Sequence, residues 1–229
     1  MDDVRILPAG DAAWLVELPE RIDVEVNERA LRIARAIDHA SLPVTDVVVG
    51  YRSVMAFVDP LAPGVDGIDA RLTELAVAAH TPDVAPAALV DVPVCYGGSY
   101  GPDLADVAAF AKCSAEEVID RHLAREYRVF MVGFVPGFAY MAPVDPRIAA
   151  PRRASPRLKV PAGSVAVAAG QTGIYPAETP GGWSLIGRCP VRPYDADRQE
   201  PFMFHPGDRV RFRRISEAEY RAASEWGDV

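Results

Sequence analysis

The chain has 229 residues, of which 50% are hydrophobic and 24% are charged, a composition typical of a folded globular protein and not of a disordered one. It carries 24 basic and 32 acidic residues, for a formal net charge of -8, so strong attraction to nucleic acid or to an anionic membrane is not expected. Because residues 1–20 are rich in acids and no apolar run reaches about 18 residues, we expect a cytoplasmic protein without a signal peptide or membrane span.

Strands and helices are predicted in alternation along the first part of the chain. Runs of β-branched and aromatic residues predict strands over residues 12–18, 46–50 and 53–58. Apolar residues at helical spacing predict helices over residues 25–38 and 68–79. With a final strand over residues 89–94, the order is β-α-β-β-α-β, the split arrangement of ferredoxin-like α+β domains.

A Pro-containing segment, residues 81–86, has the composition of a linker. We place the domain boundary there, so that residues 1–85 form a small α+β domain and residues 86–229 form a second domain, although the strand directly after the linker could belong to either domain. In the second domain, two short helices should precede a pattern of apolar runs punctuated by Gly and Pro, which starts near residue 127. That pattern indicates a closed or strongly bent β structure.

The cysteines and histidines of the chain are scattered. The three cysteines, Cys95, Cys113 and Cys189, form no CxxC pair, so we expect reduced thiols and no disulfide framework. No HExxH motif or close Cys/His cluster accompanies the four histidines, which are His39, His80, His122 and His205. We therefore expect no metal site.

The stretch of residues 146–177 contains basic side chains and no acidic one, a local inversion in an acidic protein. Its basic residues are Arg147, Arg152, Arg153, Arg157 and Lys159. One interpretation is a solvated or partner-facing surface. The other is the rim of a pocket for an anionic group, because paired guanidinium groups match the geometry of carboxylate and phosphate.

Two glycine-rich turns, residues 132–140 and 169–176, accompany this stretch. Glycine allows a positive φ or a close approach of the backbone to a ligand. Gln171, Thr172 and Tyr175 supply neutral hydrogen-bonding groups suited to an amide, whereas the GxxxxGK(S/T) spacing of a phosphate loop is absent from both turns. Alternatively, the glycines only close tight turns and the aromatic side chains pack in the core.

Two titratable residues near these turns are candidates for proton transfer. His122 lies near the end of a predicted helix, where a histidine could instead be a helix-terminal cation or a packed side chain. Glu178 is the first acid after the basic stretch and could form a salt bridge with it and nothing more. Since no Ser-x-x-Lys, GxSxG or close Cys–His pattern marks a nucleophile, these residues by themselves do not identify an enzyme.

Long strings in the second part of the chain are distinctive, namely VPVCYGG, GPDL, VGFVPGFAYM, PRRASPRLKVPAGSVAVAAGQTGIYP, ETPGGWSLIGRCP and HPGDRVRF. In order and spacing they resemble the family of allophanate hydrolase subunit 1 and the 5-oxoprolinase B-type subunit, which also includes sporulation kinase inhibitors. The resemblance covers residues 90–215 closely and the first domain only in outline. It implies that the second domain is a cyclophilin-like β-barrel, a carboxyltransferase domain of the subunit 1 type.

The resemblance also implies an activity. Members of the family belong to a heteromeric hydrolase of C–N bonds and are inactive without a partner, which is an allophanate hydrolase subunit 2 or a C-type 5-oxoprolinase subunit. Some members also need a third subunit. The implied substrate is a small carboxylate-bearing amide, either 5-oxoproline, opened with ATP, or allophanate. ATP would be used by the complex and not necessarily bound by this chain.

Under this hypothesis the residues named above take specific roles. An arginine would hold the substrate carboxylate and neutral groups would hydrogen-bond the amide. The candidate substrate-binding residues are Arg152, Arg153, Gln171, Thr172 and Tyr175. The candidate catalytic residues are His122 and Glu178.

Two alternatives remain open from the sequence. The chain could be a regulatory binding module that inhibits a histidine kinase, with the barrel as its docking surface, although nothing in the residues favours this specifically. Prolyl isomerase activity is suggested only by analogy with the fold of cyclophilin.

Overall fold

The computed structural model describes residues 4–21, 23–79 and 87–226. It consists of two compact units, residues 1–87 and residues 88–229, each with its own hydrophobic core. The predicted linker and domain boundary, like His80, lie outside the described residues. No helix in the described part of the chain is long and apolar enough to cross a membrane.

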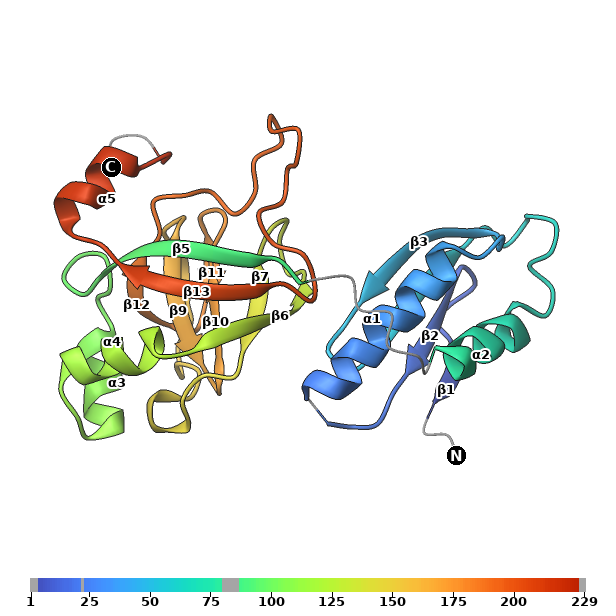
Figure 1. Ribbon diagram of the computed structural model, residues 1–229, viewed down its shortest axis with the longest axis horizontal. Helices are drawn as coiled ribbons and strands as arrows, with labels where there is room; N and C mark the ends of the chain where they lie inside the picture. The colour runs from blue at the N-terminus through green and yellow to red at the C-terminus, as the bar shows by residue number, and fades with distance from the viewer. Residues whose placement is uncertain (1–3, 22, 80–86, 227–229) are drawn as a thin grey trace. The chain divides into compact units, whose positions relative to one another are not determined.

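The first unit is a four-stranded antiparallel sheet with two helices (Figure 1). Its elements are β1 (Arg5–Pro8), β2 (Ala13–Glu17), α1 (Val24–Asp38), β3 (Val44–Val49), β4 (Ser53–Val58) and α2 (Ile68–Ala78). The strand order is β1-β2-β4-β3. The side chains of the sheet that face the helices alternate along each strand, as a half-buried sheet requires, and pack with both helices in one cluster that includes Val16, Val54, Ala56, Ile33, Ile37 and Leu72.

The predicted α+β class of this unit is confirmed, but its fourth strand is not the predicted one. The strand predicted over residues 89–94, which the sequence could place in either domain, belongs to the second unit, where it pairs in parallel with another strand. The position beside β2 is taken by β1, which the sequence pattern does not predict. β1 is only 4 residues long and mostly exposed, so it lacks an alternation long enough to recognise.

The second unit is a closed barrel, with strand order β10-β7-β6-β13-β5-β12-β9 (Figure 1). The pairing of β9 with β10 closes it, and only the β5–β13 pair is parallel. The barrel strands are β5 (Leu89–Tyr96), β6 (Glu126–Val132), β7 (Ala139–Ala142), β9 (Ser164–Ala168), β10 (Gln171–Ile174), β12 (Ser184–Arg188) and β13 (Arg209–Arg214). The β-barrel predicted for this part of the chain is therefore confirmed.

Further elements surround the barrel. They are the helices α3 (Leu104–Ala111), α4 (Ala115–Leu123) and α5 (Glu217–Ala223), a short 3-10 helix (Pro146–Ile148), and the strands β8 (Arg157–Val160) and β11 (Thr179–Gly181). β8 and β11 pair only with each other, as a small antiparallel sheet. Ser216 forms a complete capping box with Glu219 at the start of α5, whereas Ser114 at the start of α4 only accepts a hydrogen bond from the Glu117 N–H.

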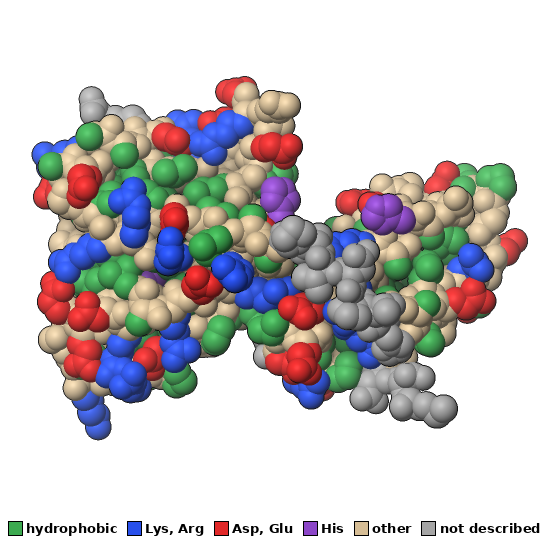
Figure 2. Space-filling view, viewed as in Figure 1, with side chains coloured by type: hydrophobic (Ala, Val, Ile, Leu, Met, Phe, Trp, Pro, Cys, Tyr) green, Lys and Arg blue, Asp and Glu red, His purple; other side chains and the backbone are tan. Residues whose placement is uncertain are grey.

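Charges of both signs are mixed over the outer surface of β5, β6 and β13 (Figure 2). The mixing reflects ion pairs between arginines of β13 and acids on neighbouring elements. Arg209 pairs with Glu126 of β6, Arg211 with Asp91 of β5, and Arg214 with Glu116 of α4. This face of the barrel therefore does not present the single-sign field that binding to a polyanion requires.

Candidate functional site

An aromatic pocket of about 280 Å³ lies beside the small β8–β11 sheet. Its aromatic lining consists of Phe134, Phe138, Tyr140, Tyr175 and Trp183, and Arg152 and Arg153 also border it. The residues that line the pocket therefore come from the first glycine-rich turn, from the basic stretch and from the segment between β10 and β12. A cavity of this size suits a small molecule.

Phe138 is the centre of the aromatic lining. Its ring meets those of Phe134, Tyr140, Tyr175 and Trp183 edge to face, with centroid distances of 5.7, 4.8, 5.2 and 5.5 Å. Edge-to-face contacts between aromatic rings are favourable beyond the apolar area that they bury. Because Phe138 itself is 2% exposed, it holds the walls of the pocket in a fixed arrangement.

Phe134 stands at the mouth of this pocket. It lies in the turn between β6 and β7 with a φ of 71°, a left-handed conformation that is uncommon for a residue with a large side chain. The side chain is 60% exposed and still contacts Phe138. An exposed aromatic residue is thus held at the mouth of the pocket.

Tyr175 presents a phenol to the pocket. Its ring fits because residue 181 is glycine, whose added Cβ would lie 2.4 Å from the Tyr175 hydroxyl oxygen. Burial raises the pKa of Tyr175, and a hydrogen bond donated by the backbone N–H of Trp183 opposes that rise. The phenol is therefore neutral at physiological pH, and it accepts from Trp183 while keeping its own proton to donate.

The two arginines of the pocket differ in their partners. The Arg152 guanidinium carbon lies 6.0 Å from the centre of the Trp183 ring, in a cation–π arrangement, and no ion pair of Arg152 occurs among the residues that the structure describes. Arg153 donates from Nη1 to the Asp103 carboxylate at 3.0 Å. Of the two, Arg152 is therefore the cation available to a ligand.

His122 and Thr172 come together, but inside the barrel and not at the aromatic pocket. Both side chains are 0% exposed, and His122 Nε2 lies 3.0 Å from Thr172 Oγ1. Thr172 donates its single hydroxyl proton to the Ala166 carbonyl, so Nε2 carries the ring proton and donates it. His122 Nδ1 then accepts from the Tyr96 hydroxyl at 2.8 Å.

Burial lowers the pKa of His122 to about 3, because the charged imidazolium would lose its hydration there. At physiological pH the ring is neutral, and both of its nitrogen atoms have partners. Gln171, the residue before Thr172 on β10, does not line the aromatic pocket.

Glu178 lies beside the small sheet and does not line the pocket either. Its carboxylate pairs with Lys159 at 3.1 Å, and the two side chains are 58% and 78% exposed. An ion pair as exposed as this contributes little to stability. No group of three or more His, Cys, Asp or Glu side chains that could hold a metal ion occurs within residues 4–21, 23–79 and 87–226.

The family model for the carboxyltransferase domain, subdomain C and D, matches residues 4–204. The B subunit of 5-oxoprolinase from Bacillus subtilis (strain 168) is 38% identical over 231 residues, which cover 94% of this chain and 95% of the relative. The chain belongs to the family of 5-oxoprolinase B subunits and carboxyltransferase domains. The resemblance seen in the sequence strings is thereby confirmed.

Two solved structures extend the comparison. TTHA0988 is 39% identical, with a TM-score of 0.78 over 89% of this chain, and the match covers 40% of that longer protein. The Kluyveromyces lactis urea amidolyase superposes with a TM-score of 0.80 over 96% of this chain and 15% of its own. At 20% identity, the second match shows a shared fold alone.

Sequence reasoning missed several residues of the pocket in this family member. Phe134, Phe138, Tyr140 and Trp183 lie in the distinctive strings but received no role, and neither did Asp103 in the string GPDL. The available signal was the placement of aromatic residues next to glycines. That signal does not tell a core aromatic residue from a pocket wall, because both follow the same local pattern.

Proposed function

We propose that this chain is the B-type subunit of a multi-subunit, ATP-dependent 5-oxoprolinase, which hydrolyses the C–N bond of 5-oxoproline. The observation that carries the proposal is the 38% identity to a 5-oxoprolinase B subunit, which extends over 94% of this chain and 95% of the relative. A match of nearly full length on both sides leaves no large part of either chain unaccounted for.

The chemistry of the aromatic pocket supports this proposal. 5-Oxoproline is a small ring with one carboxylate and one amide. The Arg152 guanidinium, which has no carboxylate partner in the described residues, offers a charge-assisted site for a carboxylate. The Tyr175 phenol offers a neutral donor for an amide carbonyl, and the aromatic walls suit the ring.

The catalytic roles predicted for His122 and Glu178 stay predictions, as do the binding roles of Gln171 and Thr172. In the isolated chain none of these four side chains lines the pocket. We propose that the reacting groups are completed by other subunits, namely a C-type 5-oxoprolinase subunit and a third one. We assign ATP to one of those subunits, because neither glycine-rich turn of this chain has the spacing of a phosphate loop.

Cytoplasmic location is part of the same proposal. Cys95, Cys113 and Cys189 are all free thiols, and two of them are buried. Unpaired thiols suit a reducing compartment, in which disulfides seldom persist.

The decisive experiment is glutamate release from 5-oxoproline and ATP by this chain purified together with its two partner subunits. We expect activity from the complete complex and none when this chain is omitted. Parallel assays leave out each other subunit in turn, and a further assay offers allophanate. A fully assembled complex that releases no glutamate would refute the proposal, and ammonia release from allophanate would then redirect it to that amide.

A further inference from the structure

Asp103 occupies the N-cap position of α3 but does not cap that helix. An aspartate at this position usually accepts a hydrogen bond from a backbone N–H of the first helical turn, which stabilises the helix by about 1 kcal/mol. Here the carboxylate points elsewhere and is only 2% exposed. A buried carboxylate that does not bind the backbone N–H groups of its own helix requires other hydrogen-bond partners to offset the cost of its desolvation.

The partners of Asp103 are two arginines and a backbone amide. Arg157 donates from both terminal nitrogen atoms, to Oδ2 at 2.8 Å and to Oδ1 at 2.6 Å. Arg153 donates to Oδ1 at 3.0 Å, and the Leu185 N–H donates to Oδ2 at 2.7 Å. The two-pronged contact with Arg157 fixes the orientation of that guanidinium as well as its position.

Residue 101 allows the carboxylate to reach this place. A Cβ on Gly101 would lie 2.0 Å from the carbonyl oxygen of Ile186, so only glycine lets this turn lie directly against β12. The Asp103 N–H then donates to the Leu185 carbonyl at 2.9 Å, which pairs the two residues through both the backbone and the side chain. Within the string GPDL, the glycine allows the turn to approach β12 and the aspartate forms the hydrogen bonds to it.

Of the two arginines that Asp103 holds, one borders the aromatic pocket and the other pairs with a strand that lines it. Arg153 borders the pocket, and its backbone N–H donates to the Gly182 carbonyl at 2.8 Å. Arg157 pairs with Gly181 between β8 and β11. Asp103 and the more exposed Asp106, which lies 3.8 Å from Arg153, balance these two guanidinium charges. Arg152 therefore supplies the positive charge that suits an anionic ligand.

We propose that Asp103 is a positioning residue of the aromatic pocket: by holding Arg153 and Arg157, its carboxylate orients the segment that carries Arg152 toward the substrate carboxylate. The identity of the ligand rests on the proposed function, whereas the anchoring of the arginines does not. Asp106 serves as the natural comparison, because it lies one turn further along α3 and reaches Arg153 only at 3.8 Å, with a side chain that is 76% exposed.

The first test measures KM and kcat for 5-oxoproline in the assembled complex. Asp103→Asn removes the charge at almost constant volume and should raise KM about tenfold or more with kcat changed less than about threefold, because ground-state anchoring is lost. Asp103→Glu keeps the charge but moves it outward by one methylene, and should give an intermediate KM. This variant also keeps the test decisive if the Asp103→Asn protein does not fold. Asp106→Asn should match the wild type.

The second test does not depend on activity. Phenylglyoxal modification, followed by peptide mass spectrometry, reports how freely Arg153 and Arg157 react in the folded chain. Both should react several-fold faster in Asp103→Asn than in the wild type, and at the wild-type rate in Asp106→Asn.

Wild-type rates of modification in both Asp103 variants, or a wild-type KM in both, would overturn the positioning role. A wild-type complex without activity toward 5-oxoproline would refute the proposed function alone. The modification rates would still decide whether Asp103 anchors the two arginines.

Discussion

At the residue scale, burial separates the roles of side chains that look alike in the sequence. His122 is a candidate proton carrier by sequence, and the barrel encloses it completely with a partner at each ring nitrogen. Arg152 is one of five basic residues in the stretch, and it borders a pocket with its charge unpaired by any described carboxylate. Each of these environments leads to a measurable consequence.

We expect His122 to make stability depend on pH. Its folded-state pKa of about 3 lies below the ordinary histidine value of 6.5, so between these values the unfolded chain binds a proton that the folded chain does not. The free energy of unfolding should therefore fall as the pH drops through this window. The substitution His122→Gln should lower the free energy of unfolding by about 1–3 kcal/mol at pH 7.5. It should also remove the part of the pH dependence that comes from His122.

Urea unfolding of both proteins at pH 7.5 and pH 4.5 measures the effect. The stability deficit of His122→Gln relative to the wild type should shrink by about 2 kcal/mol or more at the lower pH. His39→Gln is the matched control, because His39 lies at the exposed end of α1. An equal deficit of His122→Gln at both pH values would contradict the buried, neutral imidazole.

Arg152 should contribute to substrate binding. Arg152→Gln removes the charge that faces the pocket, and hydrogen bonds to charged groups are worth about 1.5–3 kcal/mol, so KM for 5-oxoproline should rise about tenfold to a hundredfold. Thermal stability should change little, since this side chain has no ion pair to lose within the described residues. Arg221→Gln, on the exposed side of α5, is the control, and an unchanged KM for Arg152→Gln would exclude the carboxylate-binding role.

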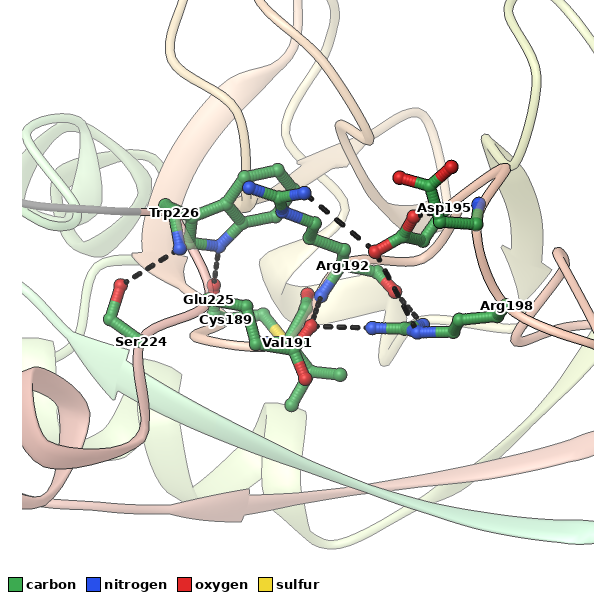
Figure 3. Close-up of polar contacts among 9 residues, drawn as sticks. Cys189, Val191, Arg192, Asp195, Arg198, Ser224, Glu225 and Trp226 are labelled. Carbon is green, nitrogen blue, oxygen red and sulfur yellow. Dashed lines mark hydrogen bonds and ion pairs between the residues drawn. The ribbon is translucent and has the colours of Figure 1, made fainter.

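At the element scale, the segment after α5, residues 224–226, makes polar contacts with the loop that follows β12, residues 189–198 (Figure 3). Trp226 donates from its indole nitrogen to the Cys189 carbonyl at 2.8 Å, and the Arg192 guanidinium lies 5.7 Å from its ring centre. The Glu225 carboxylate accepts a hydrogen bond from the backbone N–H of Arg192 at 2.9 Å. A Cβ on Gly163 would come within 2.7 Å of the indole nitrogen, so this contact requires glycine there.

We expect Trp226 to control the order of that loop. Trp226→Phe keeps an aromatic ring but leaves the Cys189 carbonyl without its donor, at a cost of about 1 kcal/mol, and Trp226→Ala should cost more because the packing is also lost. Hydrogen exchange of the backbone amides of residues 190–198 should become faster in the order wild type, Phe, Ala.

Trp14→Phe is the control for this prediction, because Trp14 belongs to the first unit. If Trp226→Ala exchanged these amides as slowly as the wild type, the loop would be held by other contacts, for example by Tyr194 against Phe202.

At the scale of the whole molecule, the chain builds two separate cores. The cluster of the first unit contains side chains of its sheet and of both its helices, and the main cluster of the second contains side chains of the barrel, α3 and α4. β5 belongs wholly to the second, because it lies between β13 and β12.

We expect residues 88–229 to fold when they are produced alone, because each strand of the barrel then keeps both of its neighbours. Thermal unfolding followed by circular dichroism should show one cooperative transition. A second fragment, residues 97–229, lacks β5 and should not fold, since the barrel would open between β13 and β12. A cooperative transition in the shorter fragment, or none in the longer one, would contradict this division of the chain.

The sequence by itself determined both fold classes, because alternation and helical spacing are local properties that survive without knowledge of distant contacts. It also determined the family, through long strings in the second part of the chain, and it located the basic stretch and the turns from which the pocket is built. The sequence did not predict β1, which is only four residues long. It also did not decide which sheet β5 joins, since a strand pattern does not identify the neighbouring strands.

Only the tertiary structure decided which candidate residues meet. Arg152 and Tyr175 share a pocket with Trp183, whereas His122 and Thr172 share the barrel core and Glu178 pairs with Lys159 outside both. Asp103 acquired a role only through Arg153 and Arg157, which are 50 and 54 residues away in the chain. Burial and hydrogen-bond partners depend on contacts between residues that are far apart in the chain, and local sequence patterns do not predict those contacts.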